Sequence, residues 1–266
     1  MRYLWPVSRL LFIIPAKGNS KSVPSKNLQL VGGESLLRKT LRLAEQSITV
    51  LDASILVSTD SKEIFNEVTE ITKCVSKEQK KFFDEQTIGS INHFTQNILI
   101  HKRPIGLSTL TSRTTALIRN LLVNEAIKDY EHFILLQPTS PFRSLTELLN
   151  ITKLYFASKT GSLVSVKKFE SPHPEKRIKL SQDNKLDLID TFVEKLSSPR
   201  QELGEYWSLD GAYYLFSREK FQSNYSLIQH DTFFYRRKGL KTINIDTVED
   251  LLFAQFIAEK RMENVE

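Results

Sequence analysis

The stretch Ile13-Ile14-Pro15-Ala16-Lys17-Gly18-Asn19-Ser20-Lys21-Ser22-Val23-Pro24-Ser25-Lys26-Asn27 indicates the fold class of this chain. It begins inside an apolar run, residues 10–14, which is typical of a buried strand. A small, polar, lysine-rich loop follows, and a helical pattern starts near Ser35. Loops of this kind hold phosphate in α/β proteins, because backbone N–H groups and hydroxyls approach the anion closely and ammonium groups neutralise its charge. The stretch therefore predicts an α/β fold with an anion site after its first strand.

The rest of the chain alternates strand-like and helical patterns. We expect strands over residues 10–14, 53–58, 132–136, 162–166, 211–216 and 242–245. We expect amphipathic helices over residues 35–48, 61–72, 114–128 and 145–156, and a last helix opened by residues 246–250. Residues 75–101 lack a clean period and are interpreted as an insertion, helical rather than extended. This order predicts one domain over residues 1–266, with residues 1–9 as an N-terminal extension and a mostly parallel, Rossmann-like sheet flanked by helices.

Composition and charge narrow the function classes. The net charge of +6 arises from 37 basic and 31 acidic residues that are mostly scattered, apart from basic runs at residues 77–81 and 236–238. A solvated surface explains this spread better than nucleic-acid binding does, and it is compatible with a small polyanionic ligand. The single cysteine, Cys74, excludes a disulfide framework and fits a reducing cytoplasm. Residues 10–14 are too short for a signal peptide or a membrane span, so we expect a soluble, cytoplasmic protein.

Candidate ligand residues gather at the predicted strand ends. Ligands bind beyond the carboxyl ends of strands in open α/β sheets, which groups the Lys17 loop, Asp60, residues 137–143 and residues 244–246 around one crevice. Asp246 either caps the last helix, which is worth about 1 kcal/mol, or binds Mg²⁺ that faces phosphates. A role in a turn is the commoner one for Asp60. The sequence thus predicts a crevice that combines a cationic loop with at least one carboxylate.

The cations of this crevice suit a polyphosphate. If Lys17, Lys21 and Lys26 converge, they match the charge of a nucleoside triphosphate; the alternative is a solvated loop. The patterns G-x-x-x-x-G-K-[ST] and G-x-G-x-x-G are absent, which disfavours an ATPase and a dinucleotide enzyme. The histidines form no ligand-spaced cluster and no Ser/His/Asp order stands out, which disfavours a zinc enzyme and a covalent hydrolase. Three arginines in polar loops are either surface residues or carboxylate clamps: Arg103, Arg143 and Arg200.

A set of short motifs points to a family. They are Ile14-Pro15-Ala16-Lys17-Gly18-Asn19-Ser20-Lys21 with Pro24 and Lys26-Asn27, Val57-Ser58-Thr59-Asp60, Leu135-Leu136-Gln137-Pro138-Thr139-Ser140-Pro141 with Arg143, Pro199-Arg200-Gln201, Gly211-Ala212-Tyr213, and Ile245-Asp246-Thr247 with Glu249-Asp250. In this order the set resembles the acylneuraminate cytidylyltransferases, or CMP-N-acylneuraminate synthetases, and their relatives that activate other nonulosonic acids. The resemblance implies a nucleotide-diphospho-sugar-transferase-like fold, with a small dimerisation lobe at about residues 168–208 that helps to form the sugar site.

The resemblance also implies a reaction. The anomeric hydroxyl of a nonulosonic acid attacks the α-phosphate of CTP, pyrophosphate leaves and a CMP-sugar forms, with charge stabilised by lysines and Mg²⁺. The implied nucleotide-binding residues are Lys17, Ser20, Lys21, Lys26, Asn27, Arg103 and Thr114, and the implied catalytic residues are Lys17, Lys21 and Asp246. The implied sugar-binding residues are Gln137, Thr139, Ser140, Arg200 and Asp210. Asp246 would bind the metal, and Asn244 stands in the place of a usual second ligand. The partners implied are CTP, a nonulosonic acid and a second copy of the chain, in the synthesis of CMP-sugars for cell-surface polysaccharides.

The chain departs from the family pattern at charged positions. Lys17 stands where the family has Arg, which keeps the charge but loses the bidentate fork. Asn244 replaces one of the two aspartates of the family's Asp-x-Asp-Thr. Residues 208–212 read Ser-Leu-Asp-Gly-Ala where sialic-acid enzymes commonly read Arg-Pro-Asn-Gly-Ala, which favours a legionaminate- or pseudaminate-type acid over N-acetylneuraminate. The added charge of Asp210 requires an amine, a hydroxyl or a metal opposite it. The alternatives are a degenerate paralogue that only binds nucleotide or sugar, and a nucleotidyltransferase for another sugar.

Overall fold

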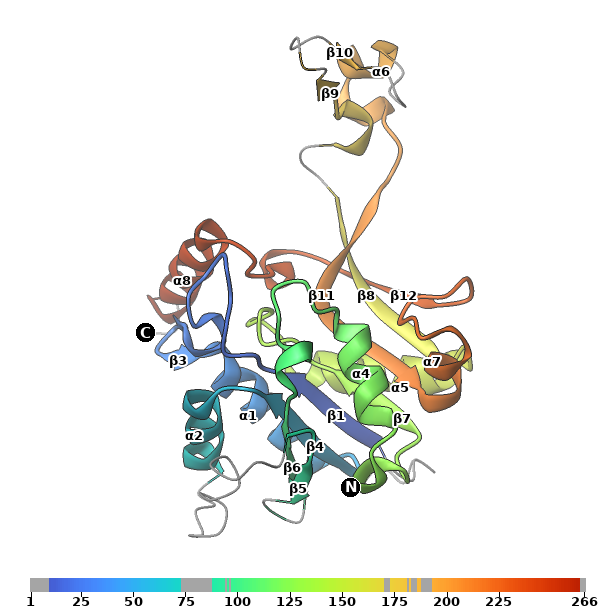
Figure 1. Ribbon diagram of the computed structural model, residues 1–266. Coiled ribbons are helices and arrows are strands. Elements are labelled where there is room, and N and C mark those ends of the chain that lie inside the picture. The colour runs from blue at the N-terminus through green and yellow to red at the C-terminus, as the bar shows by residue number, and fades with distance from the viewer. Residues whose placement is uncertain are drawn as a thin grey trace.

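The computed structural model describes residues 10–72, 88–93, 95, 97–169, 173–180, 182, 186–187 and 193–263. Its centre is an eight-stranded sheet with the order β12-β8-β11-β7-β1-β4-β6-β5 (Figure 1). The strands are β1 (Leu10–Pro15), β4 (Ala53–Thr59), β5 (Ile91–His93), β6 (Ile98–Lys102), β7 (His132–Leu135), β8 (Ser162–Lys168), β11 (Trp207–Ser217) and β12 (Phe233–Arg237). Neighbours pair in parallel except where β11 or β5 is involved. The expected mostly parallel, Rossmann-like sheet is confirmed.

Helices cover both faces of this sheet. They are α1 (Leu36–Ile48), α2 (Lys62–Ile71), α4 (Thr114–Leu122), α5 (Leu145–Ser158), α7 (Arg218–Asn224) and α8 (Val248–Glu263). Side-chain caps begin α1 and α2, because Ser35 and Ser61 accept the N–H groups of Arg38 and Ile64. No helix in the described part of the chain is long and apolar enough to cross a bilayer.

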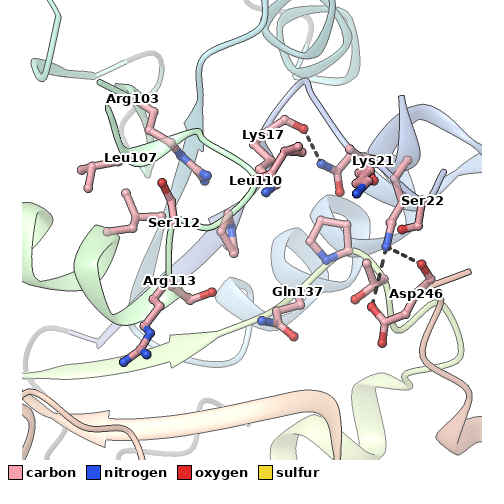
Figure 2. A pocket seen from close by; sticks show the side chains of 18 residues that line it. Lys17, Lys21, Ser22, Arg103, Leu107, Leu110, Ser112, Arg113, Gln137 and Asp246 are labelled. Atoms are coloured by element: carbon pink, nitrogen blue, oxygen red, sulfur yellow. Dashed lines mark hydrogen bonds and ion pairs between the residues drawn. The ribbon is translucent and has the colours of Figure 1, made fainter. Parts of the chain in front are cut away.

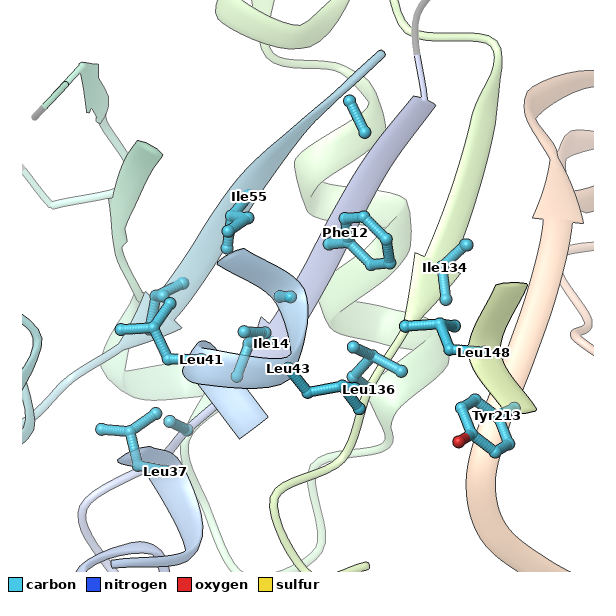
Figure 3. Close-up of a cluster of buried hydrophobic side chains, with 14 of the residues drawn as sticks. Phe12, Ile14, Leu37, Leu41, Leu43, Ile55, Ile134, Leu136, Leu148 and Tyr213 are labelled. Atoms are coloured by element: carbon cyan, nitrogen blue, oxygen red, sulfur yellow. The ribbon is translucent and has the colours of Figure 1, made fainter. Parts of the chain in front are cut away.

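Alternate side chains of β1 enter two separate cores. Phe12 and Ile14 pack with apolar residues of α1, α2 and α5 on one face (Figure 3). Leu11 and Ile13 pack with residues of α4 and α7 on the other face. All four side chains are fully buried, as expected for a central strand of a parallel sheet. A third cluster joins α8 to Val23 in the opening loop, so the last helix is fixed beside the loop that follows β1.

Several predicted elements differ in the structure. Residues 91–93 and 98–102 form β5 and β6 rather than the expected helix. Residues 98–100 are buried on both faces of the sheet, so their sequence lacks the apolar–polar alternation that would have predicted a strand. Of the predicted insertion, residues 75–87, 94 and 96 lie outside the described residues, as do residues 1–9 and Cys74. Residues 242–245 are not a strand: the short 3₁₀ turn Leu240–Thr242 precedes an irregular segment whose Ile245 N–H donates to the carbonyl of Thr139 at 2.8 Å. Strand β12 was not predicted, because its basic residues, Arg236 and Arg237, are typical of a solvent-exposed segment.

A small unit stands away from the sheet at the ends of β8 and β11 (Figure 1). It contains β9 (Lys179–Leu180), β10 (Leu186–Asp187), α6 (Val193–Ser197) and the 3₁₀ turns Pro174–Lys176 and Arg200–Glu202. The side chain of His173 accepts the N–H of Glu175 at its base, and Tyr206 donates to Glu175 at 2.8 Å. This unit coincides with the lobe expected at about residues 168–208, whose role in dimerisation stays a prediction.

Candidate nucleotide and sugar site

The candidate site lies beside β1, where the order of the strands changes: the strands that follow β1 in sequence are added first on one side of it and later on the other. Strand β1 pairs with β4 on one side and with β7 on the other, both in parallel. The chain visits β4 and β6 first and then returns across β1 to β7. A crevice forms beyond the carboxyl ends of two such strands, and this is where open α/β sheets bind ligands. The loops after β1 and β7 therefore face each other across the expected position.

A pocket of about 370 Å³ occupies this crevice (Figure 2). It is lined by Pro15, Lys17, Ser20, Lys21, Ser22, Lys26, Asn27, Arg103, Leu107, Leu110, Ser112, Arg113, Thr114, Leu117, Gln137, Pro138, Thr139 and Asp246. Most residues that the sequence placed at the nucleotide, the sugar and the metal thus come together from five separate segments of the chain. Their roles in binding stay predictions. Arg113 and the apolar residues of the 107–117 region were missed, because the sequence shows there only a Ser/Thr-rich loop.

The opening loop is held in shape by two polar residues. Asp60, at the end of β4, accepts the N–H of Gly18 at 2.9 Å. A Cβ at Gly18 would lie 2.6 Å from Cβ of Ser61, so only glycine permits this close approach. The amide of Asn27 donates to the carbonyl of Lys17 at 2.8 Å. Asp60 therefore has the turn role that we considered the commoner one, and Asn27 lines the pocket while closing the loop.

The lysines of this loop converge on the pocket. Nζ of Lys26 donates to the carbonyls of Ile245 and Asp246 at 3.0 and 3.3 Å, and lies 3.6 Å from Oδ1 of Asp246. Nζ of Lys17 contacts the carbonyl of Thr109 at 3.3 Å. Lys21 is exposed and forms no ion pair with a described residue. The five basic lining residues, Lys17, Lys21, Lys26, Arg103 and Arg113, face one acidic residue, so the pocket attracts anions.

Arg103 is the rigid cation of the pocket. Its side chain is buried, its Nη2 donates to the carbonyl of Ser58 at 2.9 Å, and its Nε donates to the hydroxyl of Ser58 at 3.1 Å. Burial lowers the pKa of Arg103 to about 10, opposed by the charge of Asp60, so it remains protonated at neutral pH. The hydroxyl of Ser58 also lies 2.9 Å from Nδ1 of His101, whose pKa burial lowers to about 4. His101 was missed, since nothing in its sequence neighbourhood indicates a role.

Asp246 presents its carboxylate to the pocket. The side chain is 70% exposed, and Asn244 Nδ2 donates to its Oδ2 at 2.7 Å. Thr247 and Asp250 cap the start of α8 reciprocally: the hydroxyl of Thr247 accepts the N–H of Asp250 at 3.2 Å, and Asp250 accepts the N–H groups of Asp246 and Thr247 at 3.0 and 2.9 Å. Gly211 leaves room for the side chain of Asn244, because a Cβ at this position would lie 3.0 Å from Oδ1 of Asn244. The carboxylate of Asp246 is thus free of a capping role.

This corner has the oxygen donors that suit a hard cation. Mg²⁺ takes one or two carboxylates and fills its other positions with phosphate oxygens and water. The carboxylate of Asp246 is exposed at the pocket, while the amide of Asn244 turns its Nδ2 to this carboxylate and its Oδ1 to the hydroxyl of Ser140 at 3.3 Å. The described residues contain no group of three or more His, Cys, Asp or Glu that could hold a metal by itself. The residues therefore fit a Mg²⁺ ion that arrives with a polyphosphate.

Two predicted sugar-binding residues are not in the pocket. Ser140 is buried and donates to the backbone carbonyl of Asp210 at 3.4 Å and to Asn244. The carboxylate of Asp210 is fully buried, where it accepts Nη1 of Arg237 at 2.8 Å and the hydroxyl of Ser165. Contrary to the expectation from the resemblance, the Asp210 carboxylate does not face the pocket, because it is paired with Arg237, a partner that no sequence pattern indicates.

The two remaining arginines of the prediction differ in outcome. Arg143 donates to the carbonyl of Ala212 at 3.2 Å and to the hydroxyl of Thr40 at 2.6 Å, so it joins α1 to β11 instead of clamping a carboxylate. Arg200 begins the 3₁₀ turn Arg200–Glu202 in the projecting unit, and its side chain lies outside the described residues. Its contact with the sugar stays a prediction.

Comparisons with known proteins agree with the motifs. Residues 11–81 match the family described as cytidylyltransferase. The chain is 25% identical over 240 residues to the N-acylneuraminate cytidylyltransferase of Streptococcus agalactiae, covering 90% of this chain and 51% of that protein. It is 30% identical over 161 residues to the CMP-N,N'-diacetyllegionaminic acid synthase of Legionella pneumophila, covering 59% and 57%. It is 23% identical to the pseudaminic acid cytidylyltransferase of Campylobacter jejuni, covering 96% and 98%.

The fold has counterparts among solved structures. A CMP:2-keto-3-deoxy-manno-octonic acid synthetase complexed with CTP superposes with a TM-score of 0.57 at 14% identity, covering 96% of this chain and all of that one. A 4-diphosphocytidyl-2C-methyl-D-erythritol synthase from Anaerococcus prevotii gives 0.54 at 15% identity, covering 94% and 98%. At these identities the likeness concerns the fold. The chain spans about half the length of the Streptococcus agalactiae relative and nearly all of the Campylobacter jejuni one. By sequence and by motif, this chain is similar to the N-acylneuraminate, legionaminic acid and pseudaminic acid cytidylyltransferases.

Proposed function

We propose that the protein transfers CMP from CTP to the anomeric hydroxyl of a nonulosonic acid and releases pyrophosphate. The observation that carries this proposal is the charge of the 370 Å³ pocket, where five basic side chains face the exposed carboxylate of Asp246 at the switch point of the sheet. A triphosphate with a divalent cation supplies the charges that such a pocket lacks. The named activities of the relatives from Streptococcus agalactiae, Legionella pneumophila and Campylobacter jejuni support cytidylyl transfer over other nucleotidyl transfers.

The residues of the opening loop would bind the triphosphate. Lys17, Lys21 and Lys26 neutralise phosphate oxygens, and the hydroxyl of Ser20 lies on the same wall of the pocket. Arg103 would bind as a pre-oriented cation, because its two hydrogen bonds to Ser58 fix the guanidinium before a ligand arrives. Charge stabilisation of this kind, with in-line positioning, is most of what phosphoryl transfer requires from a protein.

The opposite wall would bind the acceptor. Gln137 and Thr139 line the pocket after β7 and offer amide and hydroxyl groups to a polyhydroxylated sugar. Thr114, at the start of α4, completes the nucleotide side. Arg200 would reach the sugar from the projecting unit of the same or of a second copy in a homodimer. We place the reaction in the cytoplasm, where CTP is available.

Asp246 would hold Mg²⁺, and Asn244 stands in the place of a usual second ligand. When bound, this ion would neutralise phosphate charge and so make pyrophosphate a better leaving group. Asn244 orients the Asp246 carboxylate through the 2.7 Å hydrogen bond. Lys26 lies close enough to the same carboxylate to balance its charge while the site is free of ligand.

The test is pyrophosphate release with CTP, MgCl₂ and a panel of sugar acids that includes N-acetylneuraminic, legionaminic and pseudaminic acids. We expect turnover with at least one of them, and a loss of turnover on chelation with EDTA. UTP, ATP and GTP serve as controls, both in the assay and as ligands that raise the melting temperature. Stabilisation by CTP without turnover of any acid would instead identify a degenerate paralogue, and stabilisation by another triphosphate alone would identify a different nucleotidyltransferase.

A further inference from the structure

A chain of hydrogen bonds behind the nucleotide pocket ends at a histidine to which the proposed reaction assigns no role. His101 on β6 lies opposite Ser58 on β4, because the two strands pair in parallel with these residues in register. Nδ1 of His101 lies 2.9 Å from the hydroxyl of Ser58, and this hydroxyl accepts Nε of Arg103 at 3.1 Å. Arg103 lines the nucleotide pocket (Figure 2). His101 therefore reaches the buried cation of the pocket through a single hydroxyl group.

The chemistry of the donors assigns a direction to these hydrogen bonds. A guanidinium only donates, so the hydroxyl oxygen of Ser58 accepts from Arg103. Among the residues that the structure describes, Nδ1 of His101 is then the acceptor for the one proton of that hydroxyl. Nδ1 is therefore unprotonated, and the neutral imidazole carries its proton on Nε2. Burial and, to a lesser extent, the charge of Arg103 lower the pKa of His101 to about 4, which keeps the ring neutral at neutral pH.

The imidazole of His101 leaves its other nitrogen without a partner. Nε2 is buried and forms no hydrogen bond with a described residue. The three preceding residues of β6, residues 98–100, are apolar and buried, so an apolar side chain at position 101 would continue the core of this strand. A buried donor without a partner weakens the fold, and packing alone therefore does not account for a histidine here.

Arg103 depends on Ser58 for both anchors of its side chain. Nη2 of Arg103 donates to the carbonyl of Ser58 at 2.9 Å, and the same carbonyl accepts the N–H of Ala16 at 2.9 Å, directly before the Lys17 loop. The second anchor, the hydroxyl, rotates unless an acceptor fixes its proton. We propose that His101 is a positioning residue, whose Nδ1 holds the proton of Ser58 so that the hydroxyl oxygen faces Arg103 and fixes the guanidinium toward the nucleotide. The identity of this ligand rests on the proposed function.

The first test needs no substrate. In NMR spectra of the nitrogen-labelled full chain at neutral pH, His101 should be the tautomer with its proton on Nε2, and the loss of its signals in His101→Asn assigns them. The Nε–H signal of Arg103 should be sharp in the wild type and in His101→Asn, whose amide oxygen replaces Nδ1 as the acceptor, and should broaden by exchange in His101→Leu. The control is His230→Leu, at an exposed histidine outside the pocket. A proton on Nδ1, or the same Arg103 signal in every variant, would overturn the proposal.

The second test asks whether the orientation of Arg103 matters to the reaction. His101→Leu should lower kcat/KM for CTP and raise the Kd of CTP, each about tenfold, and change the KM for the sugar acid less than about twofold. His101→Asn should restore both values for CTP to within about threefold of the wild type. In an Arg103→Met background, His101→Leu should change them less than about twofold, because no guanidinium is left to orient.

Stability separates this role from packing. His101→Leu should melt at the same temperature as the wild type or higher, since it removes the unpartnered Nε2. An equal loss of CTP affinity with and without Arg103 would assign His101 to packing and overturn the proposal. If the wild type turns over no sugar acid, the proposed function fails, while the tautomer of His101 and the signal of Arg103 still decide whether His101 positions this cation.

Discussion

Two groups of charges, the buried cluster around Arg237 and the nucleotide pocket, differ in how the protein uses them. In the buried cluster, defined as Arg237, Asp210 and Glu147, the guanidinium donates to both carboxylates at 2.8 to 3.1 Å and its side chain is fully buried. In the nucleotide pocket, Asp246 is 70% exposed and its nearest cation, Lys26, lies 3.6 Å away. The charges of the buried cluster are fully paired with one another, while those of the nucleotide pocket remain available to a ligand.

This difference explains the aspartate that departs from the family pattern. Asp210 has the required group opposite it, namely Arg237, and it also accepts the hydroxyl of Ser165 and the N–H of Ala212 at 3.1 Å. The substitution therefore belongs to an internal ion cluster and adds no charge to the pocket. It is not a sign of a damaged sugar site.

The largest effect should come from breaking the buried cluster. Arg237→Met leaves two buried carboxylates without their cation, which should lower the free energy of unfolding by about 3–5 kcal/mol. Urea unfolding of the wild type and the variant measures this. The triple variant Arg237→Met, Asp210→Asn, Glu147→Gln removes the charges together and should regain most of the loss. If Arg237→Met is as stable as the wild type, the two carboxylates do not depend on Arg237 for their charge balance.

Acidification should affect the support of the pocket's buried cation, where Ser58 contacts both Arg103 and His101. His101 is buried and its pKa is lowered to about 4 from an ordinary 6.5, so the folded state binds fewer protons than the unfolded state between these values. Stability should therefore be fully present above pH 6.5 and fall by about 3 kcal/mol as the pH approaches 4. His101→Asn removes the titrating ring and should flatten this dependence; equal pH profiles of both proteins would contradict it.

The same contrast separates what the sequence predicts from what it does not. The Lys17 loop, the turn at residues 137–143 and Asp246 were predicted to share a crevice, and all three line the pocket. Topology brings the first two together, because β1 and β7 are parallel neighbours. Asp246 follows no strand, and the hydrogen bond from the N–H of Ile245 to the carbonyl of Thr139 fixes its segment beside the turn. The pairing of Arg237 with Asp210 could not be predicted, since it depends on which strands become neighbours at the far side of the sheet and on how β11 and β12 align through β8.

The strands β5 and β6 show a second limit. Residues 98–100 are apolar without alternation, and such a run is compatible with either a buried strand or a buried helix segment. Pairing with β4 decides the outcome, and pairing is a property of the folded sheet. Conversely, the apolar alternation of Ile243 and Ile245 predicted a strand, although these residues pack in the cluster below α8.

Removal of a pocket charge should lower activity and leave stability unchanged, whereas Arg237→Met should lower stability. Lys21 is exposed and unpaired among the described residues, so Lys21→Ala should change the free energy of unfolding by less than about 0.5 kcal/mol. The kcat/KM of this variant for CTP should nevertheless fall about 100-fold, because loss of one hydrogen-bond donor that stabilises transition-state charge typically has an effect of this size. Lys153→Ala on α5 is the matched control and should keep full activity. A stable Lys21→Ala protein with wild-type kinetics would remove the opening loop from the proposed triphosphate site.

The smallest effect is expected at Asn244. The side chain donates to Asp246, so the pocket already has one oriented carboxylate, and Asn244→Asp replaces this donor by a second negative charge close to the first. Without a metal the two carboxylates repel, which raises the pKa of one of them; with Mg²⁺ both can bind. We therefore expect a lower Mg²⁺ concentration at half-maximal activity and a kcat within about tenfold of the wild type, measured by pyrophosphate release over a Mg²⁺ titration. A rise from no activity to substantial activity would show instead that the natural chain is degenerate at this position. An adapted site, by contrast, gains little from the second carboxylate, because the phosphates of CTP already supply the remaining oxygens.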